Sequence, residues 1–162
     1  MTLQLIVAAL LAVISYFVWC YIHEMAHILM AKKLVGMQRY DLKVYPHRTK
    51  SNMFVWASCQ YWLNRKATDK EDGLISLAPR IPDALAVLMF PLAGLMSGWL
   101  FIFWAVFWGA GLVDLFNGSL GIRVQSDLRR ASVSFKINGF LMRIVGMTFV
   151  AASVVTALAI YF

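Results

Sequence analysis

The chain has 162 residues, of which 61% are hydrophobic and only 14% are charged, and its mean hydropathy is +0.70. A soluble domain carries about 25% charged residues, so the composition excludes a water-soluble fold and indicates one polytopic, membrane-embedded domain over residues 1–162. The net charge of +7 fits basic loops at a membrane and not a nucleic-acid partner, because no basic stretch stands on a soluble fold of its own.

A long apolar run from Leu3 to Met30 opens the sequence and is interrupted near its end by three ionisable side chains. A helix needs about 20 residues to cross a hydrocarbon core of about 30 Å, since each residue rises about 1.5 Å. We therefore predict a first span over residues 3–31. Lys32 and Lys33 mark its exit into an aqueous interface.

The pattern changes to a period of two in the segment that follows. Tyr40, Leu42 and Val44 alternate with charged residues, which is typical of a strand. A polar stretch at residues 47–52 predicts a turn, and the residues after it are aromatic and β-branched. We predict a β-hairpin over residues 38–62 that lies at the membrane surface.

The next apolar stretch is too long for one span and is broken by three prolines and several small residues. We predict spans at residues 74–95 and 97–116, the first of them irregular, and a last span at residues 139–161. The expected fold is thus mainly α, with about four transmembrane helices and one small hairpin. Arg80 and Asp83 are three residues apart, so they can pair on one helical face.

Basic residues gather in two segments: residues 32–80 contain ten Lys and Arg, and residues 117–138 contain four. Residues 1–31 and 81–116 contain none. The positive-inside rule places both basic segments in the cytoplasm, which requires an even number of crossings between them. We expect a multi-pass protein of the bacterial inner (cytoplasmic) membrane with both termini outside the cytoplasm.

Residues 23–27 read His-Glu-Met-Ala-His. On a helix His23 and His27 lie one turn apart on the same face, so both imidazoles can reach one zinc ion. Glu24 lies about 100° around the helix, where it can take a proton from a metal-bound water without ligating the metal. Ionisable side chains inside a membrane helix are costly and mark functional sites. The alternative is a pair of histidines bonded to backbone carbonyls, with Glu24 extending to the interface.

Two histidines do not complete a zinc site, and the residues directly after His27 offer no third ligand. Asp127 begins a predicted helix with Ser126 as its N-cap, whereas Asp114 ends a span. Composition does not choose between these two aspartates. The full set of candidates is Asp127, Asp114, Asp83, His47 and Cys20.

The stretch HEMAHILMAKKLVG resembles the first motif of the site-2 protease family of intramembrane zinc metalloproteases. In that family H-E-x-x-H precedes a small-residue, basic stretch that ends in Gly. The weaker matches are a surface strand at DLKVYP, Ser76-Leu77-Ala78-Pro79 where many members have Gly-Pro, a Phe-Asn pair at Phe116-Asn117, and the final Asp-Gly motif at Ser126-Asp127-Leu128. The resemblance covers about residues 16–130, with Ala78 and Leu128 in place of the family's glycines.

The resemblance implies a zinc enzyme of the bilayer that hydrolyses a peptide bond in or near a transmembrane segment of a membrane protein. In that scheme Asp127 is the third zinc ligand and Glu24 is the catalytic base. Asn117 supports the site or contacts the substrate backbone; from the residues alone it is equally a helix cap or turn residue. Non-enzymatic alternatives are an ion or proton carrier, an assembly subunit, and an inactive protease homologue.

Overall fold

The computed structural model describes residues 2–49, 52, 54–93, 98–120 and 126–161. Its helices are α1 (Thr2–Leu34), α2 (Asp69–Leu77), α3 (Arg80–Ala93), α4 (Gly98–Leu120), α5 (Asp127–Ser134) and α6 (Gly139–Tyr161). Its strands are β1 (Met37–Lys43), β2 (His47–Arg48), β3 (Phe54–Val55) and β4 (Ser58–Leu63). The chain is therefore mainly α, as predicted.

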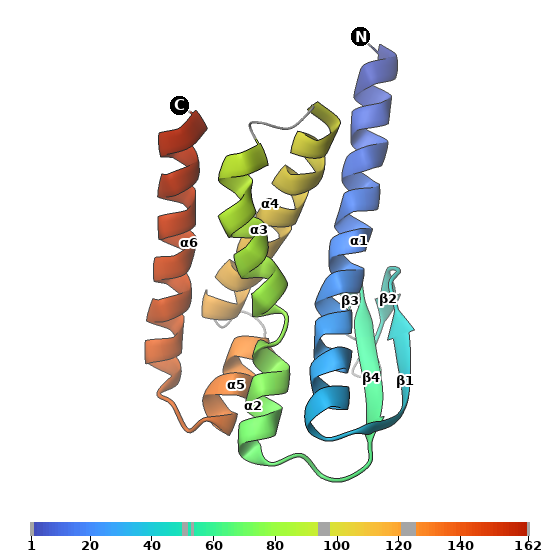
Figure 1. Cartoon of the computed structure of the whole chain (residues 1–162), viewed down its shortest axis with the longest axis vertical. Helices are drawn as coiled ribbons and strands as arrows, with labels where there is room; N and C mark the ends of the chain where they lie inside the picture. Colours follow the sequence, from blue (N-terminus) through green and yellow to red (C-terminus); the bar gives the residue numbers. More distant parts are fainter. Residues whose placement is uncertain (1, 50–51, 53, 94–97, 121–125, 162) are drawn as a thin grey trace.

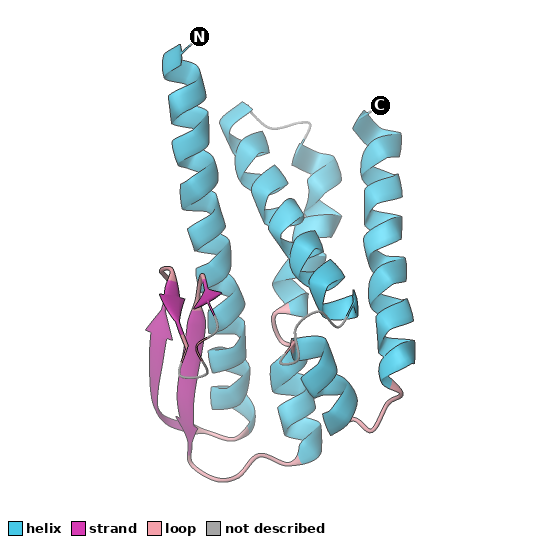
Figure 2. Cartoon of the chain, turned by 180° about the vertical axis from the view of Figure 1, so that it is seen from behind, coloured by secondary structure: helices cyan, strands magenta, loops and turns pink. Residues whose placement is uncertain are grey.

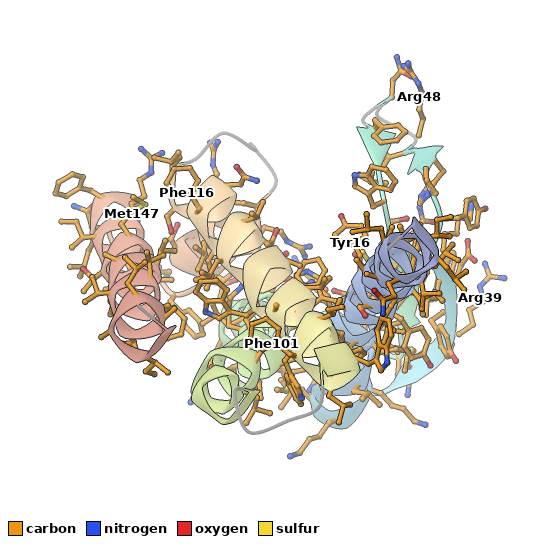
Figure 3. All side chains as sticks on the ribbon, turned by 90° about the horizontal axis from the view of Figure 1, so that it is seen from above. Tyr16, Arg39, Arg48, Phe101, Phe116 and Met147 are labelled. Atoms are coloured by element: carbon orange, nitrogen blue, oxygen red, sulfur yellow. The ribbon has the colours of Figure 1, made fainter. Side chains whose placement is uncertain are left out.

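The long helices run side by side, and both chain termini lie at one end of the molecule (Figure 1). The short helices α2 and α5 pack against each other at the opposite end. Seen from above, α4 lies between α1 and α6 and contacts both of them (Figure 3). The strands lie beside α1 on its outer side (Figure 2). The bundle thus brings segments from both halves of the sequence against the C-terminal half of α1.

Within the described residues three helices are long and apolar enough to cross a membrane: Leu3–Leu34, Gly98–Leu120 and Gly139–Ile160. All three expose large aliphatic side chains, such as Leu10, Val113 and Val155. An apolar surface of this extent is a membrane contact, because lipid does not penalise it and water does. The chain is therefore a membrane protein.

The prediction of a fourth span, at residues 74–95, is wrong. The helix breaks between Leu77 and Arg80, and the described part of the helix that follows spans only 14 residues. Such a helix is about 21 Å long, which falls short of a hydrocarbon core of about 30 Å. Pro79 lies at the break, and a proline cannot donate the hydrogen bond that would continue α2. The predicted irregularity is confirmed, as is the Arg80–Asp83 pair, with 2.7 Å between Nη1 and Oδ2.

The bounds of the other predicted spans fit the structure closely. α6 covers residues 139–161 as expected, and α1 continues past residue 31 to Leu34. α4 continues past residue 116 to Leu120, so Asn117 lies inside the last turn of a helix and is not a turn residue. Residues 94, 95 and 97 of the two central predicted spans, and residues 50, 51 and 53 of the predicted hairpin, lie outside the described residues.

The predicted hairpin is present as two short antiparallel ladders. β1 pairs with β4, and β2, which lies inside the predicted turn at residues 47–52, pairs with β3 in the predicted second strand. The ring of Trp56 lies 5.8 Å from that of Tyr16 and 6.4 Å from that of Phe17. Since these two residues lie near the middle of α1, the hairpin reaches further along that helix than a strictly interfacial position would allow.

Candidate metal centre

The two histidines of the H-E-x-x-H motif face the interior of the bundle from one side of α1. Their ring centroids are 5.5 Å apart, and their side chains are only 12% and 10% exposed for His23 and His27. The rise along α1 from Leu3 to His23 is about 30 Å. The motif therefore lies one hydrocarbon thickness from the start of α1, toward the end of the molecule that carries the basic segments.

Asp127 reaches the histidines from α5, the helix at the same end of the molecule. The Ser126 side chain accepts a hydrogen bond from the backbone N–H of Arg129 at 3.3 Å, which confirms the predicted N-cap. α5 packs on α2 at Gly73, where a Cβ atom would lie 2.6 Å from the Phe135 ring. This close approach holds α5 against α2 and so fixes the direction from which Asp127 enters the site.

One carboxylate oxygen of Asp127 is equidistant from the two histidines. Its Oδ2 lies 3.4 Å from Nε2 of His23 and 3.4 Å from Nε2 of His27. Two ligand atoms bound to zinc at about 2.0–2.2 Å in a tetrahedron stand about 3.3–3.6 Å apart. The ligand atoms of all three residues lie within 4.8 Å of one another. The two distances from Asp127 therefore match those between ligands of a tetrahedral site, in which a fourth position would be left for a water or substrate.

The hydrogen bonding of His27 also suits a metal ligand. Its Nδ1 lies 2.8 Å from the backbone carbonyl oxygen of Ile75, so Nδ1 carries the proton and donates it to that acceptor. Nε2 then presents a lone pair toward the Asp127 carboxylate, and two acceptors that face each other need a proton or a metal ion between them. Metal-bound histidines donate their second N–H to a carbonyl or carboxylate in this way.

Pro79 explains why the Ile75 carbonyl is free to accept from His27. In a continuous helix that carbonyl would accept from the backbone nitrogen four residues later, and in this chain that nitrogen belongs to Pro79 and has no hydrogen. Only the N–H of Ala78 approaches it from α2, at 3.3 Å. The helix break at Pro79, which makes the second predicted span too short, thus also leaves the carbonyl that orients the His27 ring.

We expect Pro79→Ala to lower zinc affinity by about 10-fold, because the new N–H competes with His27 for the Ile75 carbonyl and outer-shell partners of metal ligands are worth about 10- to 100-fold. Pro82→Ala is the matched control, since Pro82 lies in the first turn of α3, where a missing N–H costs little. Zinc affinity is measured by competition with a chromophoric chelator. Equal affinities of the two variants would contradict the role assigned to Pro79.

Three carboxylates surround the Arg80 guanidinium beside the histidines. Nη1 donates to Asp83, and Nη2 donates to both Asp114 and Asp127, the latter at 3.3 Å. When all three aspartates are ionised and the histidines are neutral, the guanidinium balances one of the three charges and two negative charges are left. A divalent cation between Asp127 and the histidines would neutralise them, which buried charges require.

A second set of ligand-type atoms consists of His23, Asp83 and Asp114. Arg80 already bonds to both of its carboxylates, and the Trp19 indole N–H donates to Asp83 at 3.2 Å. The positive charge that this set would attract is therefore supplied by the protein itself. Among the described residues, the set with Asp127 is the one that retains both histidines of the motif.

The carboxylate of Asp127 is held in its ionised form. Burial by itself would raise the pKa of Asp127, but without a metal ion, when His23 and His27 are protonated, their hydrogen bonds and positive charge outweigh burial and lower that pKa below its ordinary value. An ionised carboxylate is the form that ligates a metal.

Glu24 and Asn117 line the same cavities as the histidine pair. One cavity, of about 520 Å³, has walls from the motif, from Asp127 and from β4, including Cys59. An adjoining cavity, of about 330 Å³, continues along α1 and α4 and shares His23, Glu24 and Asn117 with the first. Glu24, the predicted base, and Asn117, the predicted supporting residue, thus line the same cavity as the predicted zinc ligands. The adjoining cavity extends this space between the apolar helices α1 and α4.

The two remaining candidate ligands are not part of this cluster, although Cys20 lines the adjoining cavity. His47 lies on β2, where Nε2 is 2.8 Å from the Ser58 hydroxyl oxygen. Cys20 is 4% exposed and packs against Trp19 and Phe107. Neither belongs to a group of potential metal ligands in the part of the chain that the structure describes.

The bridging position of Arg80 is not evident from the sequence. The spacing predicts a pair with Asp83 alone, whereas the guanidinium also contacts Asp114 and Asp127. The available signal was an arginine inside an apolar stretch, because a cation there must find partners in the protein. The partners themselves come from α4 and α5, and their approach depends on the packing of these helices.

The fold and the site together define a helical membrane protein with a cluster of two histidines and an aspartate that opens into a cavity. Comparisons of the chain with family models, with curated proteins and with solved structures give no match.

Proposed function

We propose that the protein is an intramembrane zinc metalloprotease of the site-2 protease type. The observation that carries the proposal is the position of Asp127 Oδ2, 3.4 Å from Nε2 of each histidine of the H-E-x-x-H motif. Asp127 is separated from the motif by 100 residues of sequence, so a chance short motif does not explain their meeting. The orientation of His27 by a backbone carbonyl and the excess negative charge support the same reading.

In this proposal His23, His27 and Asp127 hold the zinc ion. A bound zinc ion would polarise the scissile carbonyl and lower the pKa of a water molecule in the site. Glu24 takes the proton from the attacking water and returns it to the leaving amine. Asn117, on α4, lines the same cavity and donates its side-chain amide to the substrate backbone.

The proposed substrate is an extended segment of a membrane protein. Ser58, Cys59 and Tyr61 of β4 line the cavity beside Glu24, and within the described residues β4 pairs with β1 alone. A strand with one unpaired edge can add an extended peptide through main-chain hydrogen bonds. A transmembrane substrate helix that unwinds at this point would regain on β4 the hydrogen bonds it loses within itself.

The proposed location is the bacterial inner membrane, with the site near the cytoplasmic face and both termini outside. α2, α5 and the first turn of α6 lie at the end opposite the two termini (Figure 1), and this end contains Arg65, Lys66, Arg129 and Lys136. Although α3 is too short for a full span, it returns the chain to the end where the termini lie. This arrangement agrees with the positive-inside rule.

We expect single cysteines at positions 66 and 136 to react with a membrane-impermeant thiol reagent from the same, cytoplasmic side. The variants Lys66→Cys and Lys136→Cys are made in a chain with Cys20 and Cys59 changed to alanine. Labelling is compared between intact spheroplasts and inverted vesicles. Reaction from opposite sides would place an odd number of crossings between the two positions and separate Asp127 from the histidines.

The test of the proposed function joins metal analysis to a cleavage assay. The protein is purified in detergent without added metal, and its zinc content is measured by mass spectrometry of the metal. The cleavage substrate is a fluorescent peptide with one apolar helix interrupted by Gly and Pro. We expect about one zinc ion per chain and cleavage that is lost with a chelator and restored by zinc. Stoichiometric zinc without cleavage would indicate an inactive homologue, and no zinc would overturn the proposal.

A further inference from the structure

A second polar cavity lies away from the candidate metal centre, between the end of α4, α5 and the start of α6. Its volume is about 740 Å³, and its walls include Arg129, Lys136 and Arg143. No Asp or Glu is among the described residues that line it. Three cations around one space create a positive potential, which attracts an anion.

These three cations differ from the other arginines at this end of the molecule. Arg65 pairs with Glu71, Arg130 with Asp72, and Arg80 with three aspartates. Arg129, Lys136 and Arg143 form no ion pair with any carboxylate in the described ranges. Three cations that lack a carboxylate partner among the described residues thus line one cavity.

Lys136 occupies a backbone position that favours glycine. It follows the C-terminus of α5 with φ of 57°, and the N–H of Ile137 closes the helix end on the Ser132 carbonyl at 2.9 Å. Residues at this position in a helix C-cap are usually Gly, because a Cβ is penalised in the left-handed region. A lysine here carries a local cost and places its side chain at the cavity wall, which points to a role for the ammonium group.

The wall of the cavity also contains an unpaired polar group. The Ser119 hydroxyl is buried, at 1% exposure, and it has no hydrogen-bond partner within the described structure. Buried hydroxyls are almost always hydrogen-bonded.

An adjoining hollow of about 360 Å³ lies along α6. Its walls include Ser119, Arg143, Phe140, Ile144 and Met147, and Figure 3 labels Met147 on that helix. A basic cavity thus continues into an apolar groove on a membrane helix.

We propose that this composite cavity binds one anionic phospholipid, independently of the proposed protease activity. The headgroup phosphate bonds to Arg129, Lys136 and Arg143, and one acyl chain lies along Phe140, Ile144 and Met147. Basic pockets between membrane helices on the cytoplasmic side bind such headgroups. The apolar groove favours a lipid over free phosphate, because a lipid gains binding free energy from acyl-chain contacts in the groove and a phosphate ion has no such chain.

The test uses the full chain and measures lipid retention by native mass spectrometry. Wild-type protein in neutral detergent is titrated with phosphatidylglycerol or with phosphatidylcholine of the same acyl chains. We expect preferential binding of phosphatidylglycerol, weakened about fivefold by Lys136→Gly and about 30-fold by Lys136→Gly with Arg143→Gln, since each cation near a phosphate contributes about a factor of five. Lys136→Gly also relieves the left-handed strain, so its thermal unfolding midpoint should equal or exceed that of the wild type.

The matched control is Lys66→Gly with Lys70→Gln, which removes the same charge from two other exposed positions that do not line the cavity. We expect it to leave phosphatidylglycerol binding unchanged. An equal loss in this control would overturn the site in favour of general surface attraction. Equal retention of phosphatidylglycerol and phosphatidylcholine by the wild type would contradict the proposed preference for an anionic headgroup. Competition by inorganic phosphate at the lipid's own concentration would reassign the cavity to a free anion.

Discussion

Asp127→Ala is expected to weaken zinc binding by more than about 100-fold, beyond the range that outer-shell losses produce. The substitution removes the oxygen that lies 3.4 Å from both histidines and leaves only two ligands. It also leaves the Arg80 guanidinium beside the vacated position, where it repels a cation. Zinc affinity is measured by chelator competition at fixed pH, and bound zinc per chain is counted after gel filtration.

Asp114→Asn provides the control for Asp127→Ala. Asp114 bonds to the same guanidinium nitrogen of Arg80 as Asp127 does, and asparagine keeps an oxygen to accept that bond. We expect the affinity for zinc to fall by less than about 10-fold, because the change reaches the metal only through Arg80. The reverse order of the two variants would transfer the metal to the set formed by His23, Asp83 and Asp114.

Glu24→Gln is expected to retain zinc and to lower the cleavage rate by at least about 10²- to 10⁴-fold, the contribution of a positioned base. Glutamine has nearly the same shape as glutamate but cannot accept a proton from water at neutral pH. Glu24 lines the cavity next to both histidines, and it lies outside the potential ligand sets of the described structure. The rate is measured with the fluorescent helical peptide, and zinc content is measured on the same preparation.

Two outcomes of the Glu24→Gln experiment would count against the role of this residue. Cleavage at the wild-type rate would show that another group, or none, takes the proton. Loss of zinc from a folded variant would show that Glu24 is a ligand. Asn117→Ala serves as the comparison, since we assign that residue to the substrate backbone: it should raise KM more than it lowers kcat and leave the zinc content intact.

The prediction of spans failed where local composition and backbone chemistry disagree. Residues 74–95 are apolar enough for a span, but Pro79 ends one helix and a shorter helix follows. Hydropathy counts side chains, whereas the break depends on a single missing N–H. The same missing N–H leaves the Ile75 carbonyl for His27, and no pattern in the sequence relates these two distant residues.

Three features follow from the amino-acid sequence alone: the membrane class, the helix that carries the H-E-x-x-H motif, and the N-cap that starts α5. These features are local, because apolar run length, helical period and capping act over a few neighbouring residues. Tertiary structure decided which carboxylate meets the histidines. Asp83, Asp114 and Asp127 all lie near Arg80, and only the packing of α5 on α2 directs Asp127 between His23 and His27. A site assembled from α1, α3, α4 and α5 is fixed by how these helices pack, and that packing depends on shape complementarity between segments far apart in the chain.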